Sequence, residues 1–287
     1  MTKSEDLNKY AKELYFDIVT SFSPTLSPLD LKSKVDDLDK SKSLYLSATE
    51  FSHVLRSLKK HLAKHVDSRI DKGSQAKFEF LKSDDDFITG IANIKKEFSV
   101  FPDFYRYMTN MPDNDFEKFS AKYINLHFSD FSFATRKSGD GGIDFIGNGT
   151  FKKLQNFSGT LVDLKNKNIS FRIVGQSKRY KPSNAIGPKE IREFLGSVRI
   201  LQEAANPNKV NAWLGQKDVL SKIKLAEPFI YTFLTTSYYS DDAVKLATKL
   251  GIYIYDIDDL IFDLIENNIG IFNDKFVVTH FEKWCRS

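Results

Sequence analysis

Three polar residues have types and spacing that suit metal-assisted chemistry. Asp144 follows the glycine-rich turn 138–142, and Gln176 and Lys178 end a β-branched and aromatic run that begins at Ser170. Side chains of a strand alternate between its faces, so Gln176 and Lys178 project together, roughly 6.5–7 Å apart. If the two segments pair as strands, facing residues come within about 4.5–5.5 Å of each other. The sequence thus predicts a carboxylate, an amide oxygen and an ammonium in one small volume.

Those groups suit the hydrolysis of a phosphodiester. Carboxylate and carbonyl oxygens are hard ligands for Mg²⁺, which prefers about six oxygen ligands. We expect the ion to be held by Asp144, the amide oxygen of Gln176 and the backbone carbonyl of Ser177. The metal would offset charge in the transition state and help to deprotonate water, and Lys178 would orient that water. Because Gln176 lacks the formal charge of a carboxylate, we expect weak metal binding.

Two of these residues, Asp144 and Lys178, also have an ordinary structural interpretation. An aspartate beside glycines is common in loops, which is the alternative for Asp144. Lys178 stands in a basic run with Arg179 and Lys181, and such runs are usually solvated. The order of Asp144, Gln176 and Lys178 along the chain favours the catalytic interpretation.

The elements that would carry these residues alternate between strands and helices after residue 114. Runs of β-branched and aromatic residues predict strands at 131–135, 143–146, 170–178, 229–235 and 252–255. Amphipathic runs predict helices at 115–128, 188–198 and 241–250. Asn148-Gly149 is a hairpin-type signal. The fold class predicted here is α/β, a mixed β-sheet flanked by helices.

The first part of the chain is predicted to be mainly helical. Apolar spacing predicts helices at 7–18, 47–66 and 84–98, while the segment 23–43 carries no clear signal. Ser47 or Thr49 would cap the second of them. The polar segment 108–114 with its Pro112 predicts a connector. We therefore expect a mainly helical domain over residues 1–110 and a second domain over residues 111–287.

The overall composition excludes several classes of protein. A single cysteine, Cys285, leaves no disulfide framework and no thiolate metal cluster. No stretch approaches the roughly 18 uninterrupted apolar residues of a membrane span, and the N-terminus is too charged for a secretory signal. A net charge of +4 permits nucleic-acid binding without arguing for it. We expect a soluble cytoplasmic protein that does not bind membranes.

The motifs around these residues resemble a known nuclease family. Gly139-Asp-Gly-Gly-Ile-Asp144, followed by Gln176-Ser-Lys-Arg-Tyr180, resembles the Mrr-like branch of the PD-(D/E)xK nucleases, in which the last motif is often Q-x-K. Asp115-Phe-Glu117 is similar to the start of the family's first helix, and the resemblance extends to about Gly270. It implies that Glu117 reaches the metal site, directly or through water.

The resemblance also implies an activity and its partners. It predicts a prokaryotic endonuclease that cuts double-stranded DNA with Mg²⁺, for which Mn²⁺ would substitute. A chain with one site cuts one strand, so we expect a type II restriction subunit that pairs with a second nuclease subunit, identical or different. The 1–110 domain would recognise DNA, form the subunit interface, or do both.

The residues expected to contact DNA phosphates are Arg179, Lys181, Lys189 and Arg192, although exposed salt bridges are an equal alternative for each. Three other activities stay open. They are a methylation-dependent Mrr-like endonuclease, a catalytically silent DNA-binding or assembly subunit, and a resolvase of branched DNA.

Overall fold

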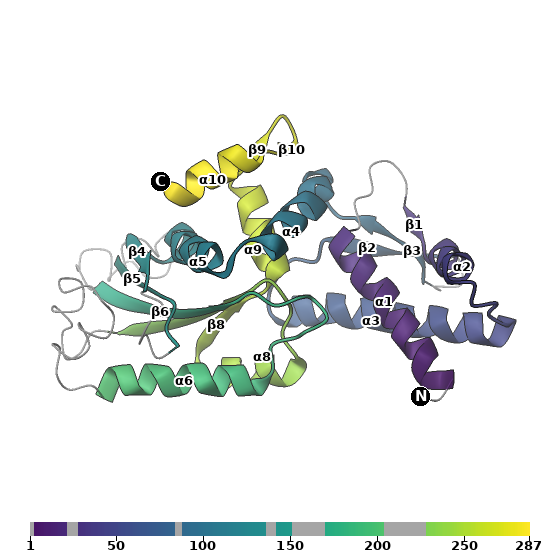
Figure 1. Ribbon diagram of the computed structural model, residues 1–287, viewed down its shortest axis with the longest axis horizontal. Helices are drawn as coiled ribbons and strands as arrows, with labels where there is room; N and C mark the ends of the chain where they lie inside the picture. Colours follow the sequence, from purple (N-terminus) through teal and green to yellow (C-terminus); the bar gives the residue numbers. More distant parts are fainter. Residues whose placement is uncertain (1–2, 22–27, 84–87, 136–141, 151–169, 204–227) are drawn as a thin grey trace. The chain divides into compact units, whose positions relative to one another are not determined.

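The computed structural model describes residues 3–21, 28–83, 88–135, 142–150, 170–203 and 228–287, and it divides into two compact units (Figure 1). Unit 1 comprises Met1–Tyr107 and Ile261–Glu282, and unit 2 comprises Met108–Leu260 and Lys283–Ser287. The segment 261–282 thus belongs to unit 1, whereas the sequence-based division assigns it to the second domain.

Unit 1 is mainly helical in its N-terminal part, as predicted. Its helices there are α1 (Lys3–Ser21), α2 (Leu31–Lys42), α3 (Ala48–Asp71) and the short 3₁₀ helix η1 (Lys96–Val100). Helix α3 begins with a capping box, because Ser47 accepts the Glu50 N–H and the Glu50 carboxylate accepts the Ser47 N–H at 2.9 Å. Ser47 is therefore the cap, rather than Thr49.

The helix predicted at 84–98 is wrong over residues 88–93, and residues 84–87 lie outside the described ranges. Residues 88–93 form strand β3 (Ile88–Asn93), which pairs antiparallel with β1 (Leu29–Asp30) and β2 (Phe78–Lys82). A Cβ atom at Gly90 would lie only 2.5 Å from the carbonyl oxygen of Leu29, so a glycine permits the close pairing with β1. Strand pairing here outweighs the apolar spacing that indicated a helix.

Two further segments differ from what the sequence indicated. Part of the unassigned segment 23–43 is helix α2, capped by the Asp30 carboxylate, which accepts the Lys32 N–H at 2.7 Å. The connector predicted at 108–114 is reduced to Met111 and Pro112, because α4 (Phe101–Asn110) ends at Asn110 and α5 (Asp113–His127) begins directly after Pro112. The remaining C-terminal elements are α9 (Ile257–Glu266), β9 (Ile271–Phe272), β10 (Lys275–Phe276) and α10 (Val278–Arg286).

Unit 2 is built on a five-stranded mixed sheet in the order β4-β5-β6-β7-β8. The strands are β4 (Phe131–Ala134), β5 (Phe145–Thr150), β6 (Ser170–Lys178), β7 (Phe229–Thr235) and β8 (Ile252–Tyr255). The first three pair antiparallel and the last three parallel. Helix α5 lies on one side of the sheet, and α6 (Pro188–Glu203) and α8 (Asp241–Leu250) lie on the other (Figure 1). The predicted mixed sheet flanked by helices is confirmed.

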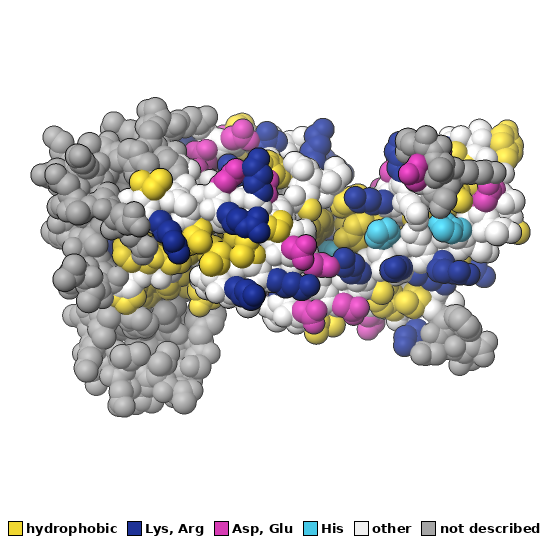
Figure 2. Space-filling view, turned by 90° about the horizontal axis from the view of Figure 1, so that it is seen from below, with side chains coloured by type: hydrophobic (Ala, Val, Ile, Leu, Met, Phe, Trp, Pro, Cys, Tyr) yellow, Lys and Arg dark blue, Asp and Glu magenta, His cyan; other side chains and the backbone are white. Residues whose placement is uncertain are grey.

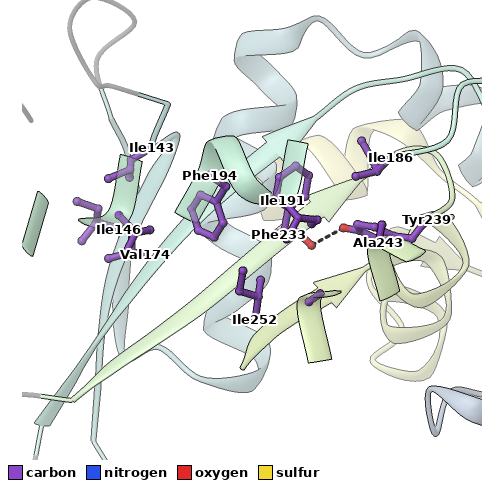
Figure 3. Close-up of a cluster of buried hydrophobic side chains, with 12 residues drawn as sticks. Ile143, Ile146, Val174, Ile186, Ile191, Phe194, Phe233, Tyr239, Ala243 and Ile252 are labelled. Carbon is purple, nitrogen blue, oxygen red and sulfur yellow. Dashed lines mark hydrogen bonds between the residues drawn. The ribbon is translucent and has the colours of Figure 1, made fainter. Parts of the chain in front are cut away.

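The core of unit 2 fills the layer between the sheet and helices α6 and α8 (Figure 3). Ile146, Val174 and Phe233 from three adjacent strands are at most 1% exposed, as is Phe194 of α6. The rings of Phe194 and Phe233 meet edge to face, with centroids 5.8 Å apart. This core fixes α6 beneath the strand that carries Gln176 and Lys178.

The hairpin predicted at Asn148-Gly149 is wrong. Both residues lie inside β5, opposite Arg172 and Phe171 of β6. A Cβ atom at Gly149 would lie 2.2 Å from the Phe128 carbonyl oxygen and 2.5 Å from the Phe171 ring. The glycine therefore serves close packing rather than a turn.

A bilayer crossing would need a longer and more apolar helix than any within the described ranges.

Candidate active site

The backbone holds Asp144 between two strands. Asp144 precedes β5 by one residue, yet its N–H donates to the Gly175 carbonyl at 2.9 Å and its carbonyl accepts the Thr135 N–H at 2.8 Å. The strand predicted at 143–146 thus begins two residues later, but the pairing of this segment with β6 places Asp144 beside the end of β6, as its sequence position suggested.

The Asp144 carboxylate is hydrogen-bonded to the residue between Gln176 and Lys178. Its Oδ2 accepts the Ser177 backbone N–H at 2.7 Å and the Ser177 hydroxyl at 3.3 Å. Ser177 is 7% exposed and Asp144 is half-buried. A hydrogen bond to an ionised acceptor is stronger than one between neutral groups, so this contact orients the carboxylate.

Gln176, on β6, is hydrogen-bonded to the segment that precedes Asp144. Its side chain is 5% exposed, and its Nε2 donates to the Gly142 carbonyl at 2.8 Å. Its Oε1 is buried and has no hydrogen-bond donor among the described residues. A buried acceptor without a donor is costly, on the order of 1–3 kcal/mol. A cation or an ordered water beside Oε1 would remove that cost.

Lys178 is the last residue of β6 and is half-buried. Strand alternation places its side chain on the face of Gln176, while Ser177 points to the opposite face. Its ammonium has no ion pair with any residue of the described ranges. The cation is therefore available for a bound anion near the end of the strand.

The donors around Asp144 fit a hard divalent cation. They comprise one carboxylate, the amide oxygen of Gln176 that lacks a donor, and the carbonyl of Ser177, all of them oxygens, as Mg²⁺ prefers. In the described part of the chain, no three His, Cys, Asp or Glu side chains gather to hold a metal ion. A cation here would depend on a single carboxylate and two neutral oxygens.

Glu117 lies in the second turn of α5 and is half-buried. Helix α5 packs against β4, β5 and β6, and its first residue, Asp113, contacts Arg179 directly after β6. The N-terminal end of α5 is therefore at the same end of the sheet as Asp144. The role of Glu117 at the metal stays a prediction.

Two of the four cations expected to contact DNA are engaged in ion pairs. Arg179 donates to the Asp113 carboxylate at 2.5 Å and to the Thr109 carbonyl at 3.1 Å. Lys189 lies 3.8 Å from the Glu193 carboxylate on the same face of α6. Exposed pairs of this kind contribute little to stability, about 0–1 kcal/mol, so DNA phosphates can compete for both cations.

Arg192 lines an open groove of about 610 Å³ between α6 and α8. Lys245 and Lys249 of α8 line the same groove, and Asp242 is its one lining acidic residue. Figure 2 shows this side of the molecule, where Lys and Arg side chains lie among hydrophobic ones over α6 and α8. Neither lysine was among the predicted site residues, although the two stand four positions apart on the predicted helix 241–250. Lys181 is exposed in the segment before α6.

Comparison with known proteins gives one family match. Residues 108–206 match the model of the Mrr catalytic-domain family, described as a restriction endonuclease. None of the curated protein sequences matches the chain. The matched range contains Glu117, Asp144, Gln176 and Lys178.

Two solved structures are similar to this chain. The DNA modification-dependent restriction endonuclease AspBHI is 16% identical, with a TM-score of 0.42 over 77% of this chain and 47% of that one. The MspJI restriction endonuclease, in complex with a 27-mer oligonucleotide, is also 16% identical, with a TM-score of 0.37 over 67% of this chain and 35% of that one. This chain thus spans less than half the length of either. By the family match, residues 108–206 are similar in sequence to a restriction endonuclease domain of the Mrr type.

Proposed function

We propose that this chain is a Mg²⁺-dependent DNA endonuclease and a subunit of a type II restriction enzyme. The observation that carries the proposal is the contact between the Asp144 carboxylate and the Ser177 N–H at 2.7 Å. This contact holds the carboxylate against the Gln176-Ser177-Lys178 strand end, within a domain whose family cuts DNA.

In this proposal, each residue has a separate task. Asp144, the Gln176 amide oxygen and the Ser177 carbonyl hold the cation, and Glu117 supports it from α5, directly or through water. When bound, the ion supplies positive charge to the scissile phosphate and favours deprotonation of the attacking water. The Lys178 ammonium donates to that water or to a phosphate oxygen, which orients the water and offsets developing negative charge.

The DNA backbone would lie along the cations that follow β6. Arg179 and Lys181 stand directly after Lys178, and Lys189 and Arg192 occupy the first turns of α6. Lys245 and Lys249 extend this set across the groove. Phosphate contacts position a protein on DNA without reading its sequence, so these residues would set affinity rather than specificity.

One site per chain hydrolyses one strand in each encounter. A double-strand break therefore requires a second nuclease subunit, either a copy of this chain or a different one. We propose the N-terminal domain, residues 1–110, as the part that recognises DNA, forms the subunit interface, or does both. Weighing the assembly in solution, with and without DNA, tests this part of the proposal.

The test of the activity is the replacement of Lys178 by Ala, with supercoiled plasmid nicking in Mg²⁺ as the measurement. Lys118→Ala is the matched control, because Lys118 is exposed and pairs with Asp115 on α5 at 3.2 Å. We expect Lys178→Ala to abolish nicking and Lys118→Ala to retain it. Equal nicking by both variants contradicts the assignment. A wild-type chain that nicks neither methylated nor unmethylated DNA, in Mg²⁺ or Mn²⁺, would instead favour a silent assembly subunit.

A further inference from the structure

Three consecutive hydroxyl residues at the end of β7 contact the backbone that leaves the candidate active site. Thr235, Thr236 and Ser237 are all fully buried. The Thr235 hydroxyl donates to the Lys178 carbonyl at 2.8 Å, and the Thr236 hydroxyl donates to the Tyr180 carbonyl at 2.9 Å. These contacts join residues more than 50 positions apart in the sequence, at the point where β6 ends.

Ser237 continues the same pattern further along the segment 179–187, here called the β6–α6 segment. Its hydroxyl lies 2.8 Å from the Asn184 carbonyl and 3.1 Å from the Lys181 carbonyl. One hydroxyl carries one proton, so it donates to one of these carbonyls at a time. Beyond it, Ile186 donates its N–H to the Tyr238 carbonyl at 2.8 Å. The three hydroxyls thus run alongside the β6–α6 segment from its start.

Further hydrogen bonds hold Thr235, Ser237 and the following Tyr238. The Ser237 N–H donates to the Thr235 hydroxyl at 3.1 Å, so Thr235 accepts one hydrogen bond while donating another to Lys178. Hydrogen bonds in such a chain polarise and strengthen one another. The Ser237 carbonyl accepts the Ile257 N–H at 3.2 Å, and the Tyr238 hydroxyl donates to the Asp258 carboxylate at 3.1 Å. Ser237 and Tyr238 are thus hydrogen-bonded to the first residues of α9.

A side-chain donor is needed here because the β6–α6 segment leaves the sheet. Buried carbonyls require a partner, and a chain that turns away from its neighbouring strand loses the regular ladder donors. The Lys178 carbonyl has the Thr235 hydroxyl at 2.8 Å and the Thr236 N–H at a longer 3.3 Å. Removing the hydroxyl would leave only the longer bond to define the backbone at Lys178.

We propose that Thr235 is a positioning residue for Lys178, and that Ser237 positions the segment that carries Arg179 and Lys181. This inference rests on the proposed function, since that function gives Lys178 its role at the phosphate. Displacements of about 1 Å at reacting groups can reduce rates by two orders of magnitude. The hydroxyls would therefore act on turnover through the backbone, without touching DNA or metal.

The experiment compares Thr235→Val, which keeps the side-chain shape, with Thr235→Ser, which keeps the hydroxyl. The matched control is Thr150→Val, because the Thr150 hydroxyl donates to the exposed Asp130 carboxylate at 3.1 Å at the last residue of β5, away from the segment and from the groove between α6 and α8. We expect Thr235→Val to lower kcat for plasmid nicking about tenfold or more, with unchanged DNA affinity in Ca²⁺. Thr235→Ser and Thr150→Val should stay close to wild type. Wild-type turnover by Thr235→Val, or a loss that serine does not restore, overturns the proposal.

Hydrogen exchange supplies a second measurement that needs no activity. Peptides covering 178–187 should exchange faster in Ser237→Ala and Thr235→Val than in the wild type, while peptides from α8 stay unchanged. Unchanged exchange in 178–187 in both variants overturns the positioning role even if the wild type cuts DNA. If the variants exchange faster but the wild type never nicks DNA, the hydroxyls do hold the backbone of 178–187 and the proposed nuclease function is wrong. The two failures are therefore distinguishable.

Discussion

The carboxylate of Asp144 is hydrogen-bonded to the backbone N–H of Ser177 at 2.7 Å, so the candidate metal ligand is oriented by the strand that carries Gln176 and Lys178. The Ser177 hydroxyl approaches the same oxygen at a longer 3.3 Å. Since the shorter bond comes from the backbone, the contact depends on the position of β6 and only weakly on the type of residue 177. A substitution of Asp144 can therefore remove its charge while keeping the hydrogen bond to the Ser177 N–H.

Asp144→Asn removes the negative charge while keeping an oxygen that can accept the Ser177 N–H. We expect nicking in Mg²⁺ to fall by about 100-fold or more, because the cation loses its only charged ligand among the three proposed donors. The melting temperature should change by only a few degrees, about the effect of 1 kcal/mol in a domain of this size. Plasmid nicking and calorimetry check the two parts.

Ser177→Ala is the control for this experiment. It keeps the backbone N–H and loses only the longer contact, so the cost should stay below about 1 kcal/mol and nicking should remain near wild type. If Ser177→Ala were as inactive as Asp144→Asn, the hydroxyl itself would be part of the chemistry, and the separate roles assigned here would be wrong.

Gln176→Glu supplies the formal charge that the site lacks. The buried Oε1 has no donor among the described residues, so a carboxylate there would bind a cation more strongly. We expect half-maximal nicking at a lower Mg²⁺ concentration than in the wild type. An unchanged Mg²⁺ requirement would show that this side chain is not a ligand.

The same variant has a second signature in the absence of metal. Burial raises the pKa of a carboxylic acid, so the folded state would retain a proton that the unfolded state releases. Stability without metal should therefore fall between pH 5 and pH 8, relative to wild type, and added Mg²⁺ should restore it. Thermal unfolding with and without EDTA measures both effects.

The strands around the site were predictable because their sequence patterns are local. The run from Ser170 to Lys178 is β-branched and aromatic, and it forms β6 over those same residues. The glycines were not predictable, because their role depends on what packs against them. Gly90 and Gly149 each leave room for atoms from another part of the chain. The residues that flank each glycine in the sequence do not reveal which atoms these are.

The contacts that orient the candidate site were beyond the sequence for a related reason. Spacing predicted that Asp144 and Gln176 would meet, but the partner of the Asp144 carboxylate is a backbone N–H, which every residue except proline possesses. The bond from Thr235 to Lys178 spans 57 positions and depends on the parallel register of β6 and β7. Such partners become visible only once the register is known.

Two glycines of unit 2 should respond to alanine in opposite directions. A Cβ atom at Gly175 would lie 2.0 Å from the Phe145 ring, so Gly175→Ala should destabilise the fold by about 1–3 kcal/mol and impair nicking. Gly196 is exposed on the outer side of α6, with nothing within 4 Å of such an atom, so Gly196→Ala should stabilise by about 0.5–1 kcal/mol. Denaturant unfolding measures both, and equal signs would contradict this packing.

Because the hydroxyl of Tyr239 is buried, we expect the protein to lose stability at high pH. Burial, followed by the charges of Asp256 and Asp259, raises the pKa of its hydroxyl well above the ordinary value, and the hydroxyl donates to the Phe233 carbonyl at 2.6 Å. At pH 7, Tyr239→Phe should lose about 1 kcal/mol. Above about pH 10 the tyrosine ionises in the unfolded state but stays protonated in the folded state, so wild-type stability falls. The advantage of wild type over Tyr239→Phe should shrink there, and a constant difference from pH 7 to pH 11 would contradict the burial.

The groove between α6 and α8 predicts a salt dependence of DNA binding. Arg192, Lys245 and Lys249 line it with one carboxylate, and none of the three has an ion pair within the described ranges. If each meets a phosphate, replacing all three by alanine should reduce the slope of log affinity against log salt by about 2.7, or 0.9 for each contact released. Binding measured in Ca²⁺ from 50 to 200 mM salt gives the slope, and Lys118→Ala should leave it unchanged. A triple variant with the wild-type slope would place the DNA elsewhere, while leaving the proposed chemistry at Asp144 intact.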